Sequence, residues 1–292
     1  MQLAIPTTQP FSFAQTLAFL DRFPPCRGEY LIEDNRLTAA ICVGGKAHAF
    51  SLVGNGDKLT VELAVDLPAT TRDAIVTHAS RFVGADDDVA DFYERAATDK
   101  PFAKLLKLLH GLHHVRFLTF PEIAVYSVMM QRAPITMAAA LKRKFLAAFG
   151  KPIDVNGHTL LAMPELDELA KLSVENVAKA IKNRGKAARI VDVIHGVSAI
   201  GEKRLREAPY AEARDALLAI PGVGPFSAAA ILLRGLGRMD ELPWLPAFSE
   251  LANKLYGRVV DHTSISRRYG TFIGYWSFYL MTGLPRIAKL DA

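Results

Sequence analysis

The sequence has few cysteines and no long uninterrupted apolar run. Its two cysteines, Cys26 and Cys42, are too few for a disulfide scaffold, a four-cysteine iron–sulfur cluster or a zinc ribbon. Charged residues interrupt every apolar run well before the roughly 20 residues that a membrane span requires. The first ten residues lack the basic and apolar regions of an export signal. We therefore expect a cytoplasmic protein that does not contact a membrane.

The chain is nevertheless rich enough in apolar residues to fold around a large core. Of its 292 residues, 50% are hydrophobic and 22% are charged, which excludes a disordered chain. This length suggests about two domains. The net charge of +5 and pI near 9.1 would suit a polyanionic partner. Basic residues gather in three groups, which are either solvated helix faces or nucleic-acid contacts: 142–144, 182–189 and 267–268.

The first third of the chain has the pattern of an antiparallel sheet. Residues 59–66 alternate apolar and polar side chains, with Leu59, Val61, Leu63 and Val65 on one side, as in a half-buried strand. Turn signals divide the region between about 28 and 67 into several short strands. Helical patterns precede and follow it. We interpret residues 1–100 as an α+β N-terminal domain with an antiparallel sheet.

From residue 101 onward the pattern becomes helical, and we interpret residues 101–292 as an all-α domain. Met137, Leu141, Phe145 and Phe149 recur every four residues, as expected of one buried helix face. Residues 156–164 read as a loop, and Ser173 is placed to cap the next helix.

A glycine turn between two predicted helices carries the strongest functional signal. We expect a helix-hairpin-helix at 214–236, with the turn at Pro221, Gly222, Val223 and Gly224 and the second helix starting near Ser227. The two glycines would supply positive φ and allow another backbone to approach. The free N–H groups of the second helix would then bind phosphate oxygens without reading any base.

The complete pattern Leu-x-x-Ile-Pro-Gly-Val-Gly-x-x-Ser-Ala resembles the helix-hairpin-helix of the base-excision DNA glycosylase superfamily. Residues 120–138 look like the helix pair around that family's DNA-penetrating loop. Residues 232–243 are similar to the stretch after the hairpin in the bacterial 3-methyladenine DNA glycosylase II branch. The resemblance covers nearly the whole chain, and it implies a monomer that binds double-stranded DNA containing damaged bases in the cytoplasm, associated with the nucleoid.

The resemblance also implies residues that extrude a base and hold it. Gln131 and Arg132 occupy the intercalating loop, where Arg132 could either fill the gap in the duplex or contact phosphate. Phe226, Tyr275 and Trp276 would form the substrate pocket. Phe11 or Phe13 would either contribute to it or pack in the core. Aromatic faces of this kind would attract a cationic alkylated base.

The catalytic carboxylate of the family is missing. In the family pattern Asp-x-Leu-Pro-x-x-Asp the second Asp is catalytic, and counting from Asp240 puts Pro246 at that position. Glu250, one helical turn later, could present a replacement carboxylate or could simply face solvent. Asp240 and Asp261 are less well placed. Bifunctional relatives have a lysine where this chain has Phe226, so a Schiff-base lyase is not expected.

These residues favour a monofunctional glycosylase that hydrolyses the N-glycosidic bond of alkylated purines. Because of Pro246, the alternative is a non-catalytic or altered member that binds damaged DNA; a remote third reading is an unrelated helical enzyme whose glycine turn holds a small phosphate. His113 and His114 lack companions at ligand spacing, and we predict no metal site and no required cofactor. The hairpin could hold a monovalent cation, as family members can.

Overall fold

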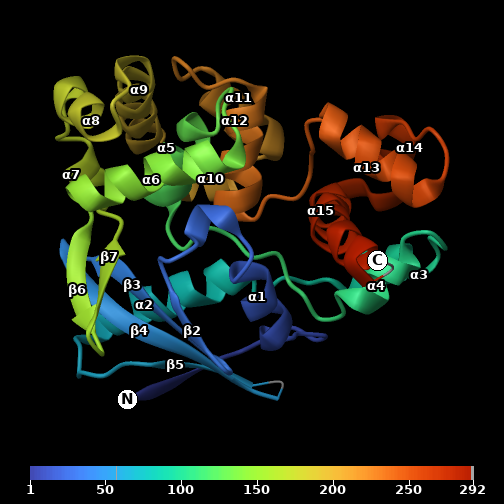
Figure 1. Ribbon diagram of the computed structural model, residues 1–292, viewed down its shortest axis with the longest axis horizontal. Coiled ribbons are helices and arrows are strands. Elements are labelled where there is room, and N and C mark those ends of the chain that lie inside the picture. Colours follow the sequence, from blue (N-terminus) through green and yellow to red (C-terminus); the bar gives the residue numbers. More distant parts are fainter. Residues whose placement is uncertain (57, 291–292) are drawn as a thin grey trace.

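The computed structural model describes residues 1–56 and 58–290, and Figure 1 shows a sheet at one end of the molecule with helices above and beside it. The sheet is antiparallel, with five strands in the order β1-β5-β4-β3-β2. These strands are β1 (Gln2–Ile5), β2 (Leu31–Glu33), β3 (Arg36–Val43), β4 (Lys46–Asn55) and β5 (Lys58–Glu62). The predicted sheet between residues 28 and 67 is thus present.

The predicted alternation holds within β5 and fails after it. Leu59, Val61 and Leu63 are buried, whereas Val65 is 63% exposed. The strand ends at Glu62, and Leu63 continues the ladder through two bonds with Met1: its N–H donates to the Met1 carbonyl, and its carbonyl accepts from the Met1 amino group. Because no strand pairs with the backbone beyond that point, Val65 has no sheet face to cover and points to solvent.

Helices α1 (Phe13–Leu20) and α2 (Ala69–Val83) flank this region, as predicted. The Ser12 side chain caps α1 by accepting a bond from the Gln15 N–H, and Gly84 ends α2 in the left-handed conformation. A short turn, η1 (Pro24–Cys26), follows α1 and brings the chain back toward the helices.

The rest of the chain is mostly helical. In order, its helices are α3 (Ala90–Ala97), α4 (Ala103–Leu108), α5 (Phe120–Met129), α6 (Ile135–Phe149), α7 (Leu166–Leu169), α8 (Val174–Ile181), α9 (Arg184–Ile200), α10 (Glu202–Glu207), α11 (Tyr210–Leu218), α12 (Pro225–Ala230), η2 (Ile231–Gly235), α13 (Pro246–Tyr256), α14 (His262–Tyr269), η3 (Gly270–Phe272) and α15 (Ile273–Leu290). Ser173 caps α8 as predicted, accepting a bond from the Asn176 N–H. No described helix is long and apolar enough to cross a membrane.

One expectation for this half of the chain was wrong, and another is confirmed only in part. Residues 156–164 are not a loop, because β6 (Lys151–Val155) and β7 (His158–Ala162) form a hairpin that packs against β3 and β4 (Figure 1). Asn156 and Gly157 both have positive φ, the geometry of a two-residue hairpin turn, so this half is not all-α. On α6 the predicted face is buried in part: Phe145 is buried and Leu141 and Phe149 pack partly against the core, whereas Met137 is exposed and Lys142 is buried beside them.

Two large hydrophobic clusters hold the molecule together. One joins the sheet, α2 and α4 to the C-terminal helix α15, so residues from both ends of the chain share a core. The other joins α5, α6, α8, α9 and the hairpin region around α11 and α12. The division of the chain at residue 100 remains a prediction.

Candidate functional site

The predicted helix-hairpin-helix is formed by α11 and α12. Gly222 adopts φ +83°, and a Cβ there would lie 3.0 Å from the Arg189 Cγ, so glycine is required at this position. Gly224 differs from the expectation, because its φ of −98° is ordinary extended backbone. Pro221 and Gly222 are exposed, whereas the Val223 and Ser227 side chains are buried. Val223 and Ser227 therefore anchor the turn, and only their backbone could meet a ligand.

The loop after α5 is bonded to this turn. The Gln131 Nε2 donates to the Gly222 carbonyl at 2.8 Å and to the Ser227 hydroxyl at 3.0 Å. The Lys186 ammonium donates to the Gln131 carbonyl at 2.7 Å and to two further carbonyls at the end of α5. Arg132 is exposed beside them and has a positive φ of 50°. The structure thus brings Gln131, Arg132 and the hairpin together.

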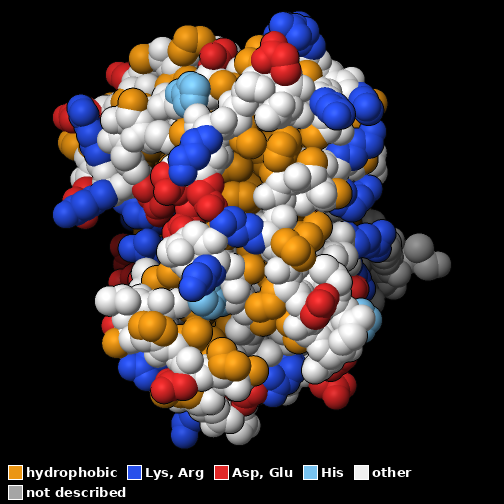
Figure 2. Space-filling view, turned by 90° about the vertical axis from the view of Figure 1, so that its left-hand side faces the viewer, with side chains coloured by type: hydrophobic (Ala, Val, Ile, Leu, Met, Phe, Trp, Pro, Cys, Tyr) orange, Lys and Arg blue, Asp and Glu red, His pale blue; other side chains and the backbone are white. Residues whose placement is uncertain are grey.

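The basic groups identified in the sequence have different fates. Arg189 is exposed beside the turn, within 3.4 Å of Gln131. Lys142, by contrast, is fully buried and cannot meet a polyanion, which corrects that expectation. On the face shown in Figure 2, Lys and Arg gather along the right-hand edge while acidic side chains cluster at mid-height. The positive charge is therefore unevenly spread over the surface.

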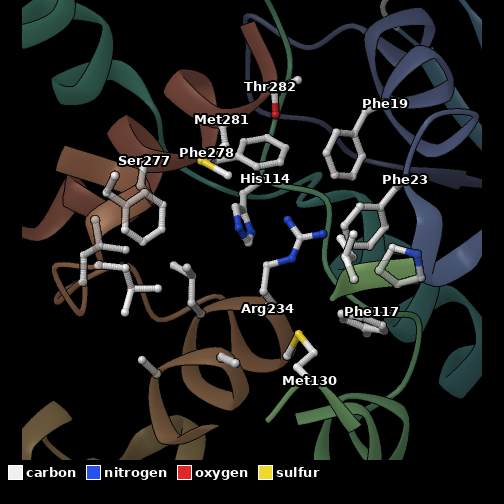
Figure 3. Close-up of a pocket in the computed structure, with 18 of the residues that line it drawn as sticks. Phe19, Phe23, His114, Phe117, Met130, Arg234, Ser277, Phe278, Met281 and Thr282 are labelled. Atoms are coloured by element: carbon white, nitrogen blue, oxygen red, sulfur yellow. The ribbon is translucent and has the colours of Figure 1, made fainter. Parts of the chain in front are cut away.

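A cavity of about 570 Å³ lies between α1, η1, α5, α12, α13 and α15. This is the size of a small-molecule binding pocket. Its lining is predominantly apolar, with aromatic side chains from distant parts of the chain: Phe19, Phe23, Phe117, Tyr126, Phe226, Phe248 and Phe278. Figure 3 shows Phe19, Phe23 and Phe278 around a common space. The pocket can bury a flat aromatic ligand.

The face of α12 with Phe226, Ala229, Ala230 and Leu233 at helical spacing lines this pocket. The residues that pack into the core from this segment are Ser227, Ala228 and Ile231. Phe226 is 38% exposed. Because Phe226 lies in the first turn of α12 and also lines the cavity, it links the hairpin to the cavity.

Tyr275 and Trp276 do not line the cavity, contrary to expectation. The Tyr275 hydroxyl donates to the Asp87 carboxylate at 2.5 Å, and Trp276 is fully buried against Trp244. The face of α15 toward the cavity carries Ser277, Phe278 and Met281, which lie one, two and five positions after Trp276.

For the N-terminal segment, the structure bears out the core-packing alternative. Phe11 and Phe13 are buried in the core. Phe19 and Phe23 occupy the cavity wall in their place.

The predicted acids also lie elsewhere. Glu250 is exposed on α13, which begins at Pro246, and Asp240 lies 3.6 Å from Arg238. Asp261 caps α14 by accepting a bond from the Ser264 N–H. Among the described residues that line the cavity, none carries a carboxylate. The structure does not bring Glu250 or Asp240 to the pocket wall.

Two polar groups in the cavity wall have no counterpart in the sequence interpretation as pocket residues. The Arg234 guanidinium lies 4.7 Å from the Phe23 ring centroid, 5.4 Å from Phe19 and 5.6 Å from Phe278. Burial lowers its pKa to about 10, so it stays charged at neutral pH. Burial, and then the charges of Arg234 and Arg116, lower the pKa of His114 well below its ordinary value. His114 is therefore a neutral imidazole.

A second buried cation lies behind the same wall. The Lys142 ammonium is 5.1 Å from the Phe117 ring centroid, and it donates to Glu29 at 2.6 Å, to Glu122 and to the Pro25 carbonyl at 3.0 Å. Cys26, Glu29 and Glu122 are close enough together to suggest a metal site. The ammonium already bonds both carboxylates, so a lysine supplies the positive charge there.

Comparisons with known proteins agree with this geometry. No protein-family model matches the chain. It is 27% identical over 214 residues to a DNA-3-methyladenine glycosylase of Bacillus subtilis, covering 71% of this chain and 70% of that protein. It is 26% identical over 211 residues to a probable bifunctional transcriptional activator/DNA repair enzyme AlkA of Mycobacterium tuberculosis, covering 70% of this chain and 41% of that protein.

Two solved structures share the fold over nearly the full length. A 3-methyladenine DNA-glycosylase from Archaeoglobus fulgidus has a TM-score of 0.77 at 20% identity, covering 95% of this chain and 97% of that one. The 8-oxoguanine glycosylase/lyase of Clostridium acetobutylicum has a TM-score of 0.73 at 15% identity, covering 97% and 96%. The chain is thus a homologue of the DNA-3-methyladenine glycosylases and has the helix-hairpin-helix glycosylase fold.

Proposed function

We propose that the chain is a monofunctional DNA glycosylase of base excision repair, which extrudes an alkylated purine from duplex DNA and hydrolyses its N-glycosidic bond. The observation that carries this proposal is the aromatic cavity of about 570 Å³ directly beside the glycine hairpin. A base taken out of the stack needs such a pocket, because it loses its stacking partners and must find new ones. The names of the homologues support the same reaction.

The hairpin and its neighbours would hold the DNA backbone. The N–H groups in the first turn of α12 lack intrahelical partners and can donate to phosphate. Arg189 and Arg132 are exposed on the same side and would neutralise neighbouring phosphates. Arg132, whose φ is positive, would also be the residue that enters the gap left by the base.

The hairpin turn could also hold a monovalent cation that bridges to a phosphate. The Ile220 carbonyl accepts one bond from the Val223 N–H and the Gly222 carbonyl one from Gln131. A carbonyl has two lone pairs, so each can still act as a cation ligand. The cation would add positive charge next to the DNA backbone.

Hydrolysis without a lyase step follows from the residues at the pocket. A Schiff base needs an unprotonated amine that can reach the sugar. Phe226 stands where bifunctional relatives place that lysine. Lys142, behind Phe117, has its pKa raised because the charges of Cys26, Glu122 and Glu29 outweigh burial, so it remains protonated and bonded to its carboxylates.

A second candidate function is selective binding of damaged DNA without base release. It is favoured by one observation: none of the described residues lining the pocket offers a carboxylate to stabilise an oxocarbenium-like sugar. Pro246 begins α13 at the position where the family pattern has that acid.

Single-turnover release of bases from duplex DNA that carries either cationic or neutral alkylated purines distinguishes the two functions. We expect release by the wild type. A loss of at least about 100-fold in Glu250→Gln or Asp240→Asn would identify that acid as the group that stabilises the developing charge, although neither lines the cavity at rest. Equal rates in both variants would mean that another group acts. No release, together with tight binding that is selective for damage, would instead establish the second function.

A further inference from the structure

The aromatic cage of the pocket already contains a cation. Three ring faces, from Phe19, Phe23 and Phe278, surround the guanidinium of Arg234 at distances of 4.7 to 5.6 Å from centroid to Cζ (Figure 3). Such rings attract positive charge through their negative faces. Here the guanidinium of Arg234 already occupies the ring faces, so a second cation would gain little from them.

The charge of Arg234 has no opposite charge at the pocket. Its described neighbours in the lining include two more arginines, Arg22 and Arg286, and no acid. Asp87 is already paired with Arg116, which lies behind His114, so its negative charge is not free to balance Arg234. In a partly enclosed apolar cavity, like charges repel more strongly than in water. The pocket therefore carries a net positive potential.

The same wall has hydrogen-bonding capacity that the fold leaves unused. The Arg234 Nη2 and both ring nitrogens of His114 are buried and have no hydrogen-bond partner within the described chain. Figure 3 shows the imidazole and the guanidinium side by side in the cavity wall. Buried donors without partners are costly, and a ligand that accepts from them would recover that energy.

We propose that this pocket selects a neutral base that presents hydrogen-bond acceptors, such as a carbonyl oxygen, to Arg234 and His114, and that it disfavours N-alkylated purines that carry a positive charge. Arg234 would be the specificity-determining residue. This inference rests on the proposed function and narrows its substrate class to alkylated bases that remain uncharged.

Two damaged bases that have the same shape but differ in charge show whether the pocket discriminates by charge or by shape. The probes are duplexes with 7-methylguanine, which is cationic, or 7-methyl-7-deazaguanine, its neutral isostere, both on a 2′-fluoro sugar that resists hydrolysis. Both bases keep the same carbonyl acceptor. We expect the wild type to bind the neutral isostere about tenfold more tightly, because one pair of like charges in a low-dielectric site is worth at least that. Equal binding, or tighter binding of the cation, would overturn the inference.

Variants test whether Arg234 is responsible. Arg234→Met should bring the two affinities within about twofold of each other, and Arg234→Lys should keep the preference because it keeps the charge. Arg267→Met, an exposed arginine on α14, removes the same charge away from the pocket and should leave the preference unchanged. A preference that survives Arg234→Met would overturn the assignment to Arg234. If neither lesion is bound more tightly than undamaged duplex, the proposed function fails instead.

Discussion

Two cations lie on either side of the segment that contains Phe117, Lys142 fully buried and Arg234 partly buried, and their surroundings differ. Lys142 bonds to two carboxylates and a carbonyl, so each of its three N–H donors has a partner. Arg234, whose own carbonyl accepts the Phe117 N–H at 2.8 Å, faces aromatic rings and keeps an unpaired nitrogen. A buried charge with all partners present is structural. A charge whose donors lack partners, as at Arg234, can still bond to a ligand that enters the pocket.

The largest expected effect is on the paired side. Lys142→Met would leave Glu29 and Glu122 buried without their shared cation, and we expect a loss of about 3 to 5 kcal/mol in the free energy of unfolding. Denaturant unfolding of the variant measures this directly. Lys144→Met, an exposed neighbour on α6, should change stability by less than about 0.5 kcal/mol. Similar losses in both variants would show that the ion pairs of Lys142 are not what matters.

The pH dependence of stability gives a second test of the Lys142 cluster, through its partner Glu29. Burial first, and then the Glu122 charge, raise the pKa of Glu29 from 4.5 to about 7 against the opposing effect of Lys142. Between these two values the folded chain holds a proton that the unfolded chain has released. The Glu29 contribution therefore favours folding below about pH 4.5 and is lost as pH rises toward 7, by at most about 1.4 kcal/mol per pH unit.

Glu29→Gln should remove this contribution. The stability of the wild type minus that of the variant should fall as pH is raised from 4.5 to 7. Glu33→Gln, which removes an exposed carboxylate on β2, is the control. A difference that is constant across this window for Glu29→Gln would contradict the assignment.

The smallest expected effect is on the unpaired side. Arg234→Met removes a buried donor that has no partner and keeps most of the apolar stem, while it loses the attraction to three rings. These contributions oppose each other, and we expect a change in unfolding free energy below about 1 kcal/mol, measured by the same denaturant method. A loss as large as that of Lys142→Met would end the distinction between the two cations and make Arg234 structural as well.

Local patterns predicted the parts of the molecule that depend on neighbours in sequence. The sheet, the glycine hairpin and the cap at Ser173 all follow from spacing and turn residues. The β6–β7 hairpin was equally local, since Asn156-Gly157 is a strong turn signal, but the helical surroundings led to its interpretation as a loop.

The pocket could not be predicted in this way, because it depends on which helix faces meet. Phe278 lines the cavity and Trp276 does not, although both lie on α15 two residues apart. Lys142 and Lys144 belong to the same basic run, and only tertiary packing buries the first and leaves the second exposed. Arg234 gave no signal at all, since an arginine in an apolar helix reads equally well as a surface residue.

The bonds of Gln131 determine where deformation must occur when the protein acts on a duplex. Gln131 ties the loop after α5 to the turn at Gly222, and Lys186 fixes the same loop from α9 through its backbone. With the loop and the turn joined in this way, the proposed extrusion of a base would distort the DNA more than the protein. A step that bends or unstacks easily, or a mispaired base, would then be opened at lower cost, so the mechanical properties of the DNA itself would contribute to which sites are found.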